Sequence, residues 1–164
     1  MTALIVYESM FGNTHQIAEA IAVGLREQAE VEIFDVALAP AVIPHGVDLV
    51  VLGGPTHAFS MSREGTRGDA VRRGADDQDL RTGIREWLDG LPPKGSEARF
   101  AAFDTREDIP LLPGSAAKSA TKVARHLGFR VAEPESFLVG SYEGPVIAGE
   151  LERATEWGRR LAEA

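Results

Sequence analysis

Cysteine is absent from the 164 residues, which excludes a disulfide framework, a thiolate metal site, an iron–sulfur cluster and a cysteine nucleophile. No apolar run approaches the roughly 20 residues of a membrane-spanning helix. The stretch Met1–Leu4 also lacks the basic residues of a secretory signal. We therefore expect a cytoplasmic chain without membrane insertion, in which any redox chemistry belongs to a bound cofactor.

Positive charge is scarce, with 17 Lys and Arg against 25 Asp and Glu and a net charge of -8. This balance argues against a nucleic-acid-binding protein, which needs clustered cations. It suits a basic protein partner, although an acidic surface also serves solubility. The hydrophobic share of 44% and the charged share of 26% are typical of an ordinary globular protein. The length fits one domain, residues 1–164.

Short apolar runs alternate with stretches of helical periodicity along the chain. The runs predict five strands, at residues 3–7, 31–36, 48–52, 99–104 and 135–139. Helices are expected from residue 14 and around residues 84–91, 120–127 and 151–161. Trp87 and Trp157 have helical spacing with aliphatic neighbours, so we assign both to packing. The alternation predicts a doubly wound α/β domain, a parallel sheet with helices on both faces.

The stretch 60–80 is polar and irregular. It predicts a surface insertion, with a short helix at residues 66–73. Its arginines alternate with acidic residues, so we expect a solvated surface from Arg63, Arg67, Arg72 and Arg73.

In open α/β sheets, ligands bind beyond the carboxyl ends of the strands, so the loops 8–14, 53–62 and 104–115 are the candidates. The first loop suits a phosphate, because Gly12 allows close backbone approach while Ser9, Asn13 and Thr14 offer donors. The following helix adds free amides. Residues 8–25 contain no Lys or Arg, so amides and hydroxyls would hold the phosphate without an ion pair. The alternative is an ordinary turn whose helix is capped by Asn13.

Two of these loops resemble those of a known family. The segment Ser9-Met10-Phe11-Gly12-Asn13-Thr14 is similar to the phosphate-binding pattern of flavodoxins. The segment Gly53-Gly54-Pro55-Thr56 is similar to the flavin-ring loop of flavodoxins and flavodoxin-like quinone reductases. Residues 103–106 and 112–118 also resemble actinobacterial flavodoxin-family proteins. The resemblance implies bound flavin mononucleotide (FMN) and an open five-stranded flavodoxin-like sheet of order 2-1-3-4-5.

The resemblance also implies a set of cofactor-binding residues. They are Ser9, Met10, Phe11, Gly12, Asn13 and Thr14 at the phosphate, Pro55, Thr56, His57, Ala58 and Phe59 at the ring, and Asp104, Thr105 and Arg106 in the third loop. Two departures stand out: Phe11 replaces a usual hydroxyl residue, and loop 104–115 has no aromatic residue. One ring face is therefore expected to rest on Leu111 or Leu112, or to stay open to a substrate.

Three functions follow as hypotheses. The first is an electron-transfer protein whose FMN passes electrons between redox partners, with basic proteins as the expected partners. The second is an FMN-dependent NAD(P)H:quinone-type oxidoreductase, suggested by the missing aromatic and the 60–80 insertion. The third is a flavodoxin-like binding module without a cofactor, suggested by Phe11. No residue is assigned a catalytic role, and no metal site is predicted.

Overall fold

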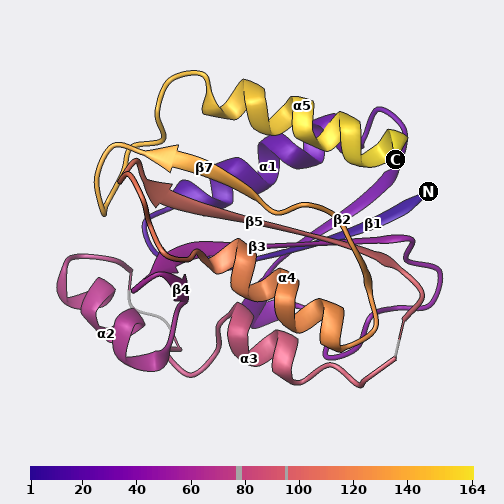
Figure 1. Ribbon diagram of the computed structural model, residues 1–164, viewed down its shortest axis with the longest axis horizontal. Helices are drawn as coiled ribbons and strands as arrows, with labels where there is room; N and C mark the ends of the chain where they lie inside the picture. The colour runs from indigo at the N-terminus through magenta and orange to yellow at the C-terminus, as the bar shows by residue number, and fades with distance from the viewer. Residues whose placement is uncertain (77–78, 95) are drawn as a thin grey trace.

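The computed structural model describes residues 1–76, 79–94 and 96–164. A sheet lies between two layers of helices (Figure 1). Helices α1 (Asn13–Leu25) and α5 (Glu150–Glu163) cover one face, and α3 (Ile84–Asp89) and α4 (Ala116–His126) cover the other. The short α2 (Glu64–Arg72) lies near the edge where the strands end, and a 3₁₀ turn (Val36–Leu38) follows the second strand. None of the described helices is both long and apolar enough to cross a membrane.

The sheet contains the strands β1 (Thr2–Tyr7), β2 (Glu30–Asp35), β3 (Leu49–His57), β4 (Ser60–Met61), β5 (Arg99–Glu107), β6 (Arg130–Val131) and β7 (Glu135–Val139). The order is β2-β1-β3-β5-β6, with β4 paired to β3 and β7 paired to β5. All pairs are parallel except β3 with β4. With β5 as the fourth predicted strand and β7 as the fifth, the predicted order 2-1-3-4-5 is confirmed.

The predicted number of five strands is wrong, because the sheet has seven strands in the described part of the chain. Both additional strands are two residues long, too short to give a periodic signal in the sequence. β6 and β7 occupy successive positions along the same edge of β5. Pro134 lies between them, and it has no backbone N–H to continue the ladder. The fifth position of the sheet is therefore one interrupted strand.

Two hydrophobic cores lie on the two faces of the sheet. Alternate residues of β1 point to opposite faces, so Leu4 packs in the core under α3 and α4, and Ile5 packs in the core under α1 and α5. Both are fully buried. This burial on both faces explains why the central strands are continuous apolar runs. Trp87 and Trp157 belong to these cores, which confirms their predicted packing role.

Two glycines bring α1 and α5 into close contact. A methyl group at Gly24 would lie 2.0 Å from the carbonyl oxygen of Thr155, and one at Gly158 would lie 2.3 Å from that of Ile21. Both obstructing atoms are backbone, so no side-chain rotation relieves the clash. The distance between the two helices depends on these glycines.

We expect Gly158→Ala to lower the free energy of unfolding by about 1–3 kcal/mol, the usual cost of overpacking a close-packed interior. Chemical denaturation measures the change. Gly65→Ala in α2 is the matched control, because that exposed position has open space around it and Ala favours a helix over Gly. A Gly158→Ala protein as stable as the wild type would contradict the close contact.

Candidate functional site

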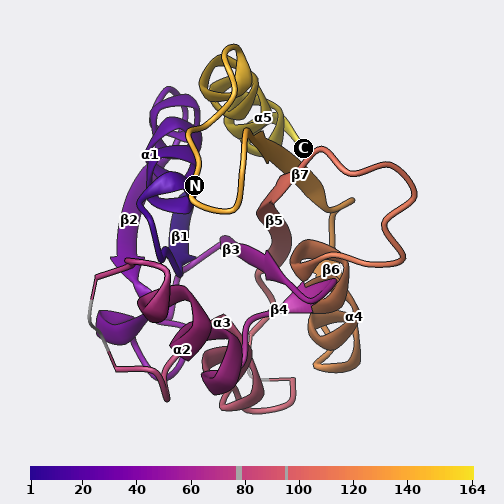
Figure 2. The same cartoon turned by 90° about the vertical axis from the view of Figure 1, so that its left-hand side faces the viewer.

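The carboxyl ends of the parallel strands meet at one edge of the sheet (Figure 2). A hollow opens there between the loops that follow β1 and β7 and the ends of β3 and β5. Its lining includes most of the predicted residues: Ser9, Met10, Phe11, Asn13, Thr14, Pro55, Thr56, His57, Thr105 and Arg106. It also includes Glu107, Val139 and Tyr142, which the sequence analysis did not select. We call this space the inner hollow.

The loop between β1 and α1 is held by its own first hydroxyl. Ser9 Oγ accepts hydrogen bonds from the backbone N–H groups of Gly12 (3.1 Å) and His15 (3.3 Å). Gly12 has a φ of 89°, in the left-handed region that favours glycine. The alternative in which Asn13 caps the helix is wrong, because Gly12 is the N-cap and Asn13 is the first residue of α1. Asn13 Nδ2 instead donates to the carbonyl oxygen of Glu143 at 3.0 Å. The Asn13 side chain therefore joins two loops.

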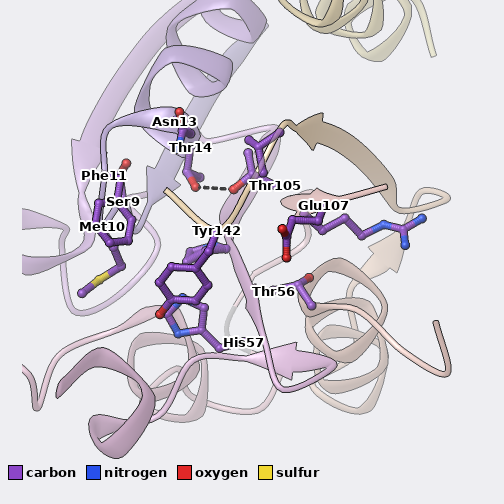
Figure 3. A pocket seen from close by; sticks show the side chains of 13 residues that line it. Ser9, Met10, Phe11, Asn13, Thr14, Thr56, His57, Thr105, Glu107 and Tyr142 are labelled. Carbon is purple, nitrogen blue, oxygen red and sulfur yellow. Dashed lines mark hydrogen bonds between the residues drawn. The ribbon is translucent and has the colours of Figure 1, made fainter. Parts of the chain in front are cut away.

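The first turn of α1 offers donors to an anion. The N–H groups of Asn13 and Thr14 have no carbonyl four residues earlier within the helix, and they make no hydrogen bond in the described part of the chain. The positive end of the helix dipole adds to them. Thr14 Oγ1 lies 2.7 Å from Thr105 Oγ1 (Figure 3), and either hydroxyl can donate. This end of the inner hollow suits a phosphate held by amides and hydroxyls.

A second hollow continues from the first and shares Thr56, His57, Glu107 and Tyr142 with it. We call it the outer hollow. Ala58, Phe59, Thr66, Asp69, Arg73, Ile109 and Leu112 complete its lining. Ala58 and Phe59, predicted as ring contacts, thus lie here and not in the inner hollow. Leu112 lies here too, whereas Leu111 is 99% exposed. Together the two hollows form an elongated site with a polar inner end and a more apolar outer end.

The turn between β3 and β4 has a strained backbone. Ala58 and Phe59 both have positive φ, 47° and 64°, as a two-residue hairpin of the primed type requires. Such conformations are unfavourable for residues other than glycine. The carbonyl oxygen of Phe59 would lie 2.7 Å from a methyl group at Gly114, so the β5–α4 loop packs against this turn. The strained turn leaves Phe59 half exposed beside the outer hollow.

His57 and Tyr142 stack where the two hollows join (Figure 3). Their ring centroids are 5.9 Å apart and their planes differ by 22°. Burial, helped by the nearby charge of Arg67, lowers the pKa of His57 to about 4, so the ring is neutral at pH 7. The Arg73 guanidinium lies 4.1 Å from the centroid of the Tyr142 ring. An aromatic platform therefore exists, supplied by the second loop and by the loop after β7.

Tyr142 had no signal in the sequence because its loop matches no motif. This loop is brought to the site by contacts with residues 9–14, the predicted phosphate-binding segment, which we call the phosphate loop. Asn13 bonds to Glu143, and a methyl group at Gly144 would lie 2.5 Å from Asn13 Oδ1. Asn13 and Glu143 are far apart in the sequence, so no local pattern predicts this contact.

Asp104 does not line either hollow, contrary to the expectation that grouped it with Thr105. Successive side chains of β5 point to opposite faces, so Thr105 meets Thr14 while Asp104 points toward α4. There Asp104 Oδ2 accepts from the N–H of Ala117 at 2.9 Å. Its other oxygen has no hydrogen-bond partner in the described part of the chain. Burial raises the pKa of Asp104. Its carboxylate accepts a hydrogen bond from the first turn of α4 and does not face the two hollows.

Arg67 corrects the expectation of a solvated arginine surface in the 60–80 insertion. Its side chain is 1% exposed and binds the Ser62 hydroxyl (2.9 Å), the Leu80 carbonyl oxygen (2.6 Å) and the Glu86 carboxylate. Glu8, which immediately precedes the phosphate loop, lies 3.7 Å from Arg67 Nε. Buried charges of this kind need partners. The insertion is thus anchored inside the protein.

Glu8 connects the insertion to the sheet edge. Its carboxylate accepts from the Ser62 hydroxyl and from the N–H of Ile84 at 2.9 Å, and its own N–H donates to the carbonyl oxygen of Gly53 at 2.9 Å. Burial raises the pKa of Glu8. These contacts fix α2 relative to the phosphate loop, so that Thr66, Asp69 and Arg73 reach the outer hollow.

The fold and the site together define a doubly wound α/β protein whose first loop has free amide and hydroxyl donors beside an aromatic site. Residues 4–66 match the family described as "Flavodoxin domain". No curated protein sequence matches the chain. The family match covers the first part of the chain, from β1 to the start of α2.

Solved structures of flavodoxins share the fold. A flavodoxin from the domain Archaea is 20% identical, with a TM-score of 0.68 and coverage of 99% of this chain and 97% of that one. The flavodoxin of Megasphaera elsdenii in its two-electron reduced form is 20% identical, with a TM-score of 0.62 and 99% coverage of both chains. A WrbA-like flavodoxin from Agrobacterium tumefaciens is 19% identical, with a TM-score of 0.58 and coverage of 99% and 95%. These identities establish the common fold.

Asp104 predicts a pH dependence of stability. Because burial raises the folded-state pKa of Asp104 above its ordinary value of 3.8, its stabilising contribution is full below that value and is lost as pH rises through the folded pKa. The Asp104→Asn protein lacks this titration. We expect the unfolding free energy of the wild type, minus that of Asp104→Asn, to fall as pH rises from about 4 to 7.

Denaturation curves of both proteins across this pH range measure the difference. Asp108→Asn is the control, because Asp108 is exposed; its curve should stay parallel to that of the wild type. A constant difference between the wild type and Asp104→Asn would contradict the raised pKa.

Proposed function

We propose that this protein binds FMN and transfers electrons between redox partners. The observation that carries the proposal is the continuity of the two hollows, which joins a phosphate-type loop to an aromatic platform. Bound FMN would supply one- and two-electron chemistry. The chain's residues would bind and orient it.

The residues of the inner hollow fit a phosphate monoester. The free amides of α1 and the hydroxyls of Thr14 and Thr105 lie at one end, and residues 8–25 carry no cation. Ser9 Oγ now occupies two amides, and it can rotate to donate to a phosphate oxygen. Phe11, which departs from the family pattern, still lines the hollow. The substitution removes a side-chain hydroxyl at residue 11 and keeps its backbone N–H.

The residues at the outer end fit a planar ring. His57 and Tyr142 provide aromatic surface, and Thr56 lies at the edge of both hollows. Thr56 Oγ1 accepts from the N–H of Ala116 at 2.9 Å, so its orientation is fixed. Ile109 and Leu112 add apolar side chains to this lining, and they would exclude water from a bound ring.

The charge of the protein supports a carrier that meets basic partners. A net charge of -8 attracts a cationic docking surface and accelerates encounter at low salt. Glu107 and Asp69 place negative charge in the lining of the outer hollow. Negative charge near a flavin disfavours its anionic reduced form and lowers the potential.

A second candidate is an NAD(P)H:quinone-type oxidoreductase. The observation in its favour is the outer hollow, whose third-loop contribution is the aliphatic pair Ile109 and Leu112 and contains no aromatic residue. Steady-state oxidation of NADPH with a benzoquinone, using FMN-loaded protein, separates the two. Turnover supports the enzyme, and its absence supports the carrier.

FMN binding is tested first by the visible spectrum of the purified protein, followed by extraction of any cofactor and by titration with FMN. We expect a yellow protein, or one that quenches FMN fluorescence. A protein that stays colourless and leaves the fluorescence unchanged would overturn the proposal and favour a binding module without cofactor.

Thr14→Val should weaken FMN binding about tenfold or more, because a hydrogen bond to a charged group contributes about 1.5–3 kcal/mol. Fluorescence titration measures the affinity. Thr2→Val is the matched control, because Thr2 begins β1 at the opposite edge of the sheet. Equal affinities for wild type and Thr14→Val would contradict a phosphate at this loop.

A further inference from the structure

We infer that His57 carries its proton on Nδ1, donates it to Thr66, and presents an unprotonated Nε2 to the ligand as a hydrogen-bond acceptor. The inference rests on the proposed function for the identity of the ligand, an isoalloxazine ring. It adds that α2 orients His57 through Thr66, and that His57 then selects a ring with an N–H donor.

The first step is the hydrogen-bond balance of the Thr66 hydroxyl. Thr66 Oγ1 has three neighbours: the N–H of Arg63 at 2.9 Å, the carbonyl oxygen of Arg63 at 3.0 Å, and Nδ1 of His57 at 3.1 Å. A hydroxyl has one proton and two lone pairs. The N–H of Arg63 must donate to one lone pair, and the carbonyl oxygen can only receive the proton.

All three contacts are satisfied only if His57 donates to the second lone pair. If Thr66 instead donated to Nδ1, two oxygen atoms would face each other at 3.0 Å without a proton between them. The local geometry of α2 thus selects the Nδ1–H tautomer. The identity of the tautomer follows from the bond that the other ring nitrogen makes.

The second step concerns Nε2. Among residues 1–76, 79–94 and 96–164, the hydrogen bond of the His57 ring is the one from Nδ1 to Thr66, and none reaches Nε2. His57 lines both hollows, and the Tyr142 ring stacks on its face, which leaves the edge that carries Nε2 uncovered by that contact. Since the pKa of His57 is lowered to about 4 by burial, the lone pair stays free of a proton at pH 7. A ligand in this place meets an acceptor with no competing protein donor.

The third step is the rigidity of the arrangement. Thr66 lies in α2, one residue before Arg67, whose buried side chain is bound to Ser62, Leu80 and Glu86. The buried pair of Glu8 and Arg67 therefore holds Thr66 in place. His57 is oriented by the 60–80 insertion, and Thr66 acts as a positioning residue.

The chemical consequence is a preference among rings. The oxidised isoalloxazine ring has one N–H group, at N3, and an acceptor at Nε2 would favour it. An analogue methylated at N3 would leave Nε2 without a partner, and a polar group buried without a partner is costly.

The tautomer is tested on protein without FMN, by long-range proton–nitrogen correlation NMR of the histidine rings. His57→Phe assigns the His57 signals. We expect a protonated Nδ1 and an unprotonated Nε2 at pH 7. A protonated Nε2 would overturn the inference, whether or not FMN binds.

Thr66→Val and Thr66→Ser test the positioning role. Thr66→Val should abolish the single tautomer and weaken FMN binding about three- to tenfold, while Thr66→Ser, which keeps the hydroxyl, should restore both. Matching circular dichroism spectra show that the variants fold alike. An unchanged tautomer in Thr66→Val would refute the role of Thr66.

The ligand's role is tested with FMN and its N3-methyl analogue. Methylation should weaken binding to the wild type about tenfold and should matter much less to His57→Phe. Equal losses in both proteins would refute the acceptor role of His57. Failure of wild-type protein to bind FMN at all would overturn the proposed function instead, and the NMR result would stand apart from it.

Discussion

Parallel pairing of β1 with β3 is the constraint on which the site depends. Residues Ala3–Tyr7 align with residues Leu49–Gly53, so the loops that follow these two strands start side by side. β5 continues the alignment on the other side of β3 up to Pro55, which aligns with Thr105. Three loops of the chain thus open at one edge. Because β1 also pairs with β2, the phosphate loop follows an interior strand of the sheet and not an edge strand.

A buried charge network extends this edge into the insertion. The guanidinium of Arg67 and the carboxylate of Glu8 are both almost completely buried, and desolvating two charges opposes folding. The neighbouring hydroxyl, carbonyl and amide groups satisfy them. The network fixes the position of α2, because Arg67 of that helix binds Glu8, the residue that precedes the phosphate loop. A hydrophobic contact would be less directional.

The segment 8–25 contributes no Lys or Arg to the site, and the cations in the lining are Arg106 in the inner hollow and Arg73 in the outer one. Free amides at the start of α1 and the paired hydroxyls of Thr14 and Thr105 lie at one end, and the rings of His57 and Tyr142 lie at the other. The neutrality of His57 follows from burial beside Arg67. Both ends are pre-organised by contacts between loops: Asn13 holds the loop of Tyr142, and Thr66 holds His57. Pre-organisation of this kind lowers the entropic cost of binding.

Apolar periodicity predicted the layered α/β fold and the five main strands, and the Ser9–Thr14 motif predicted the loop that follows β1, because both are local properties of the sequence. The strand order followed from the resemblance to flavodoxins. Helical spacing also placed Trp87 and Trp157 in the cores. Packing set three features that no local pattern predicted: Asp104 faces α4, Arg67 is buried and Tyr142 lines the site. Each of these depends on a partner far away in the chain. Packing decides that Thr105 of β5 faces the phosphate loop while Asp104 faces α4. Local sequence patterns do not encode this choice.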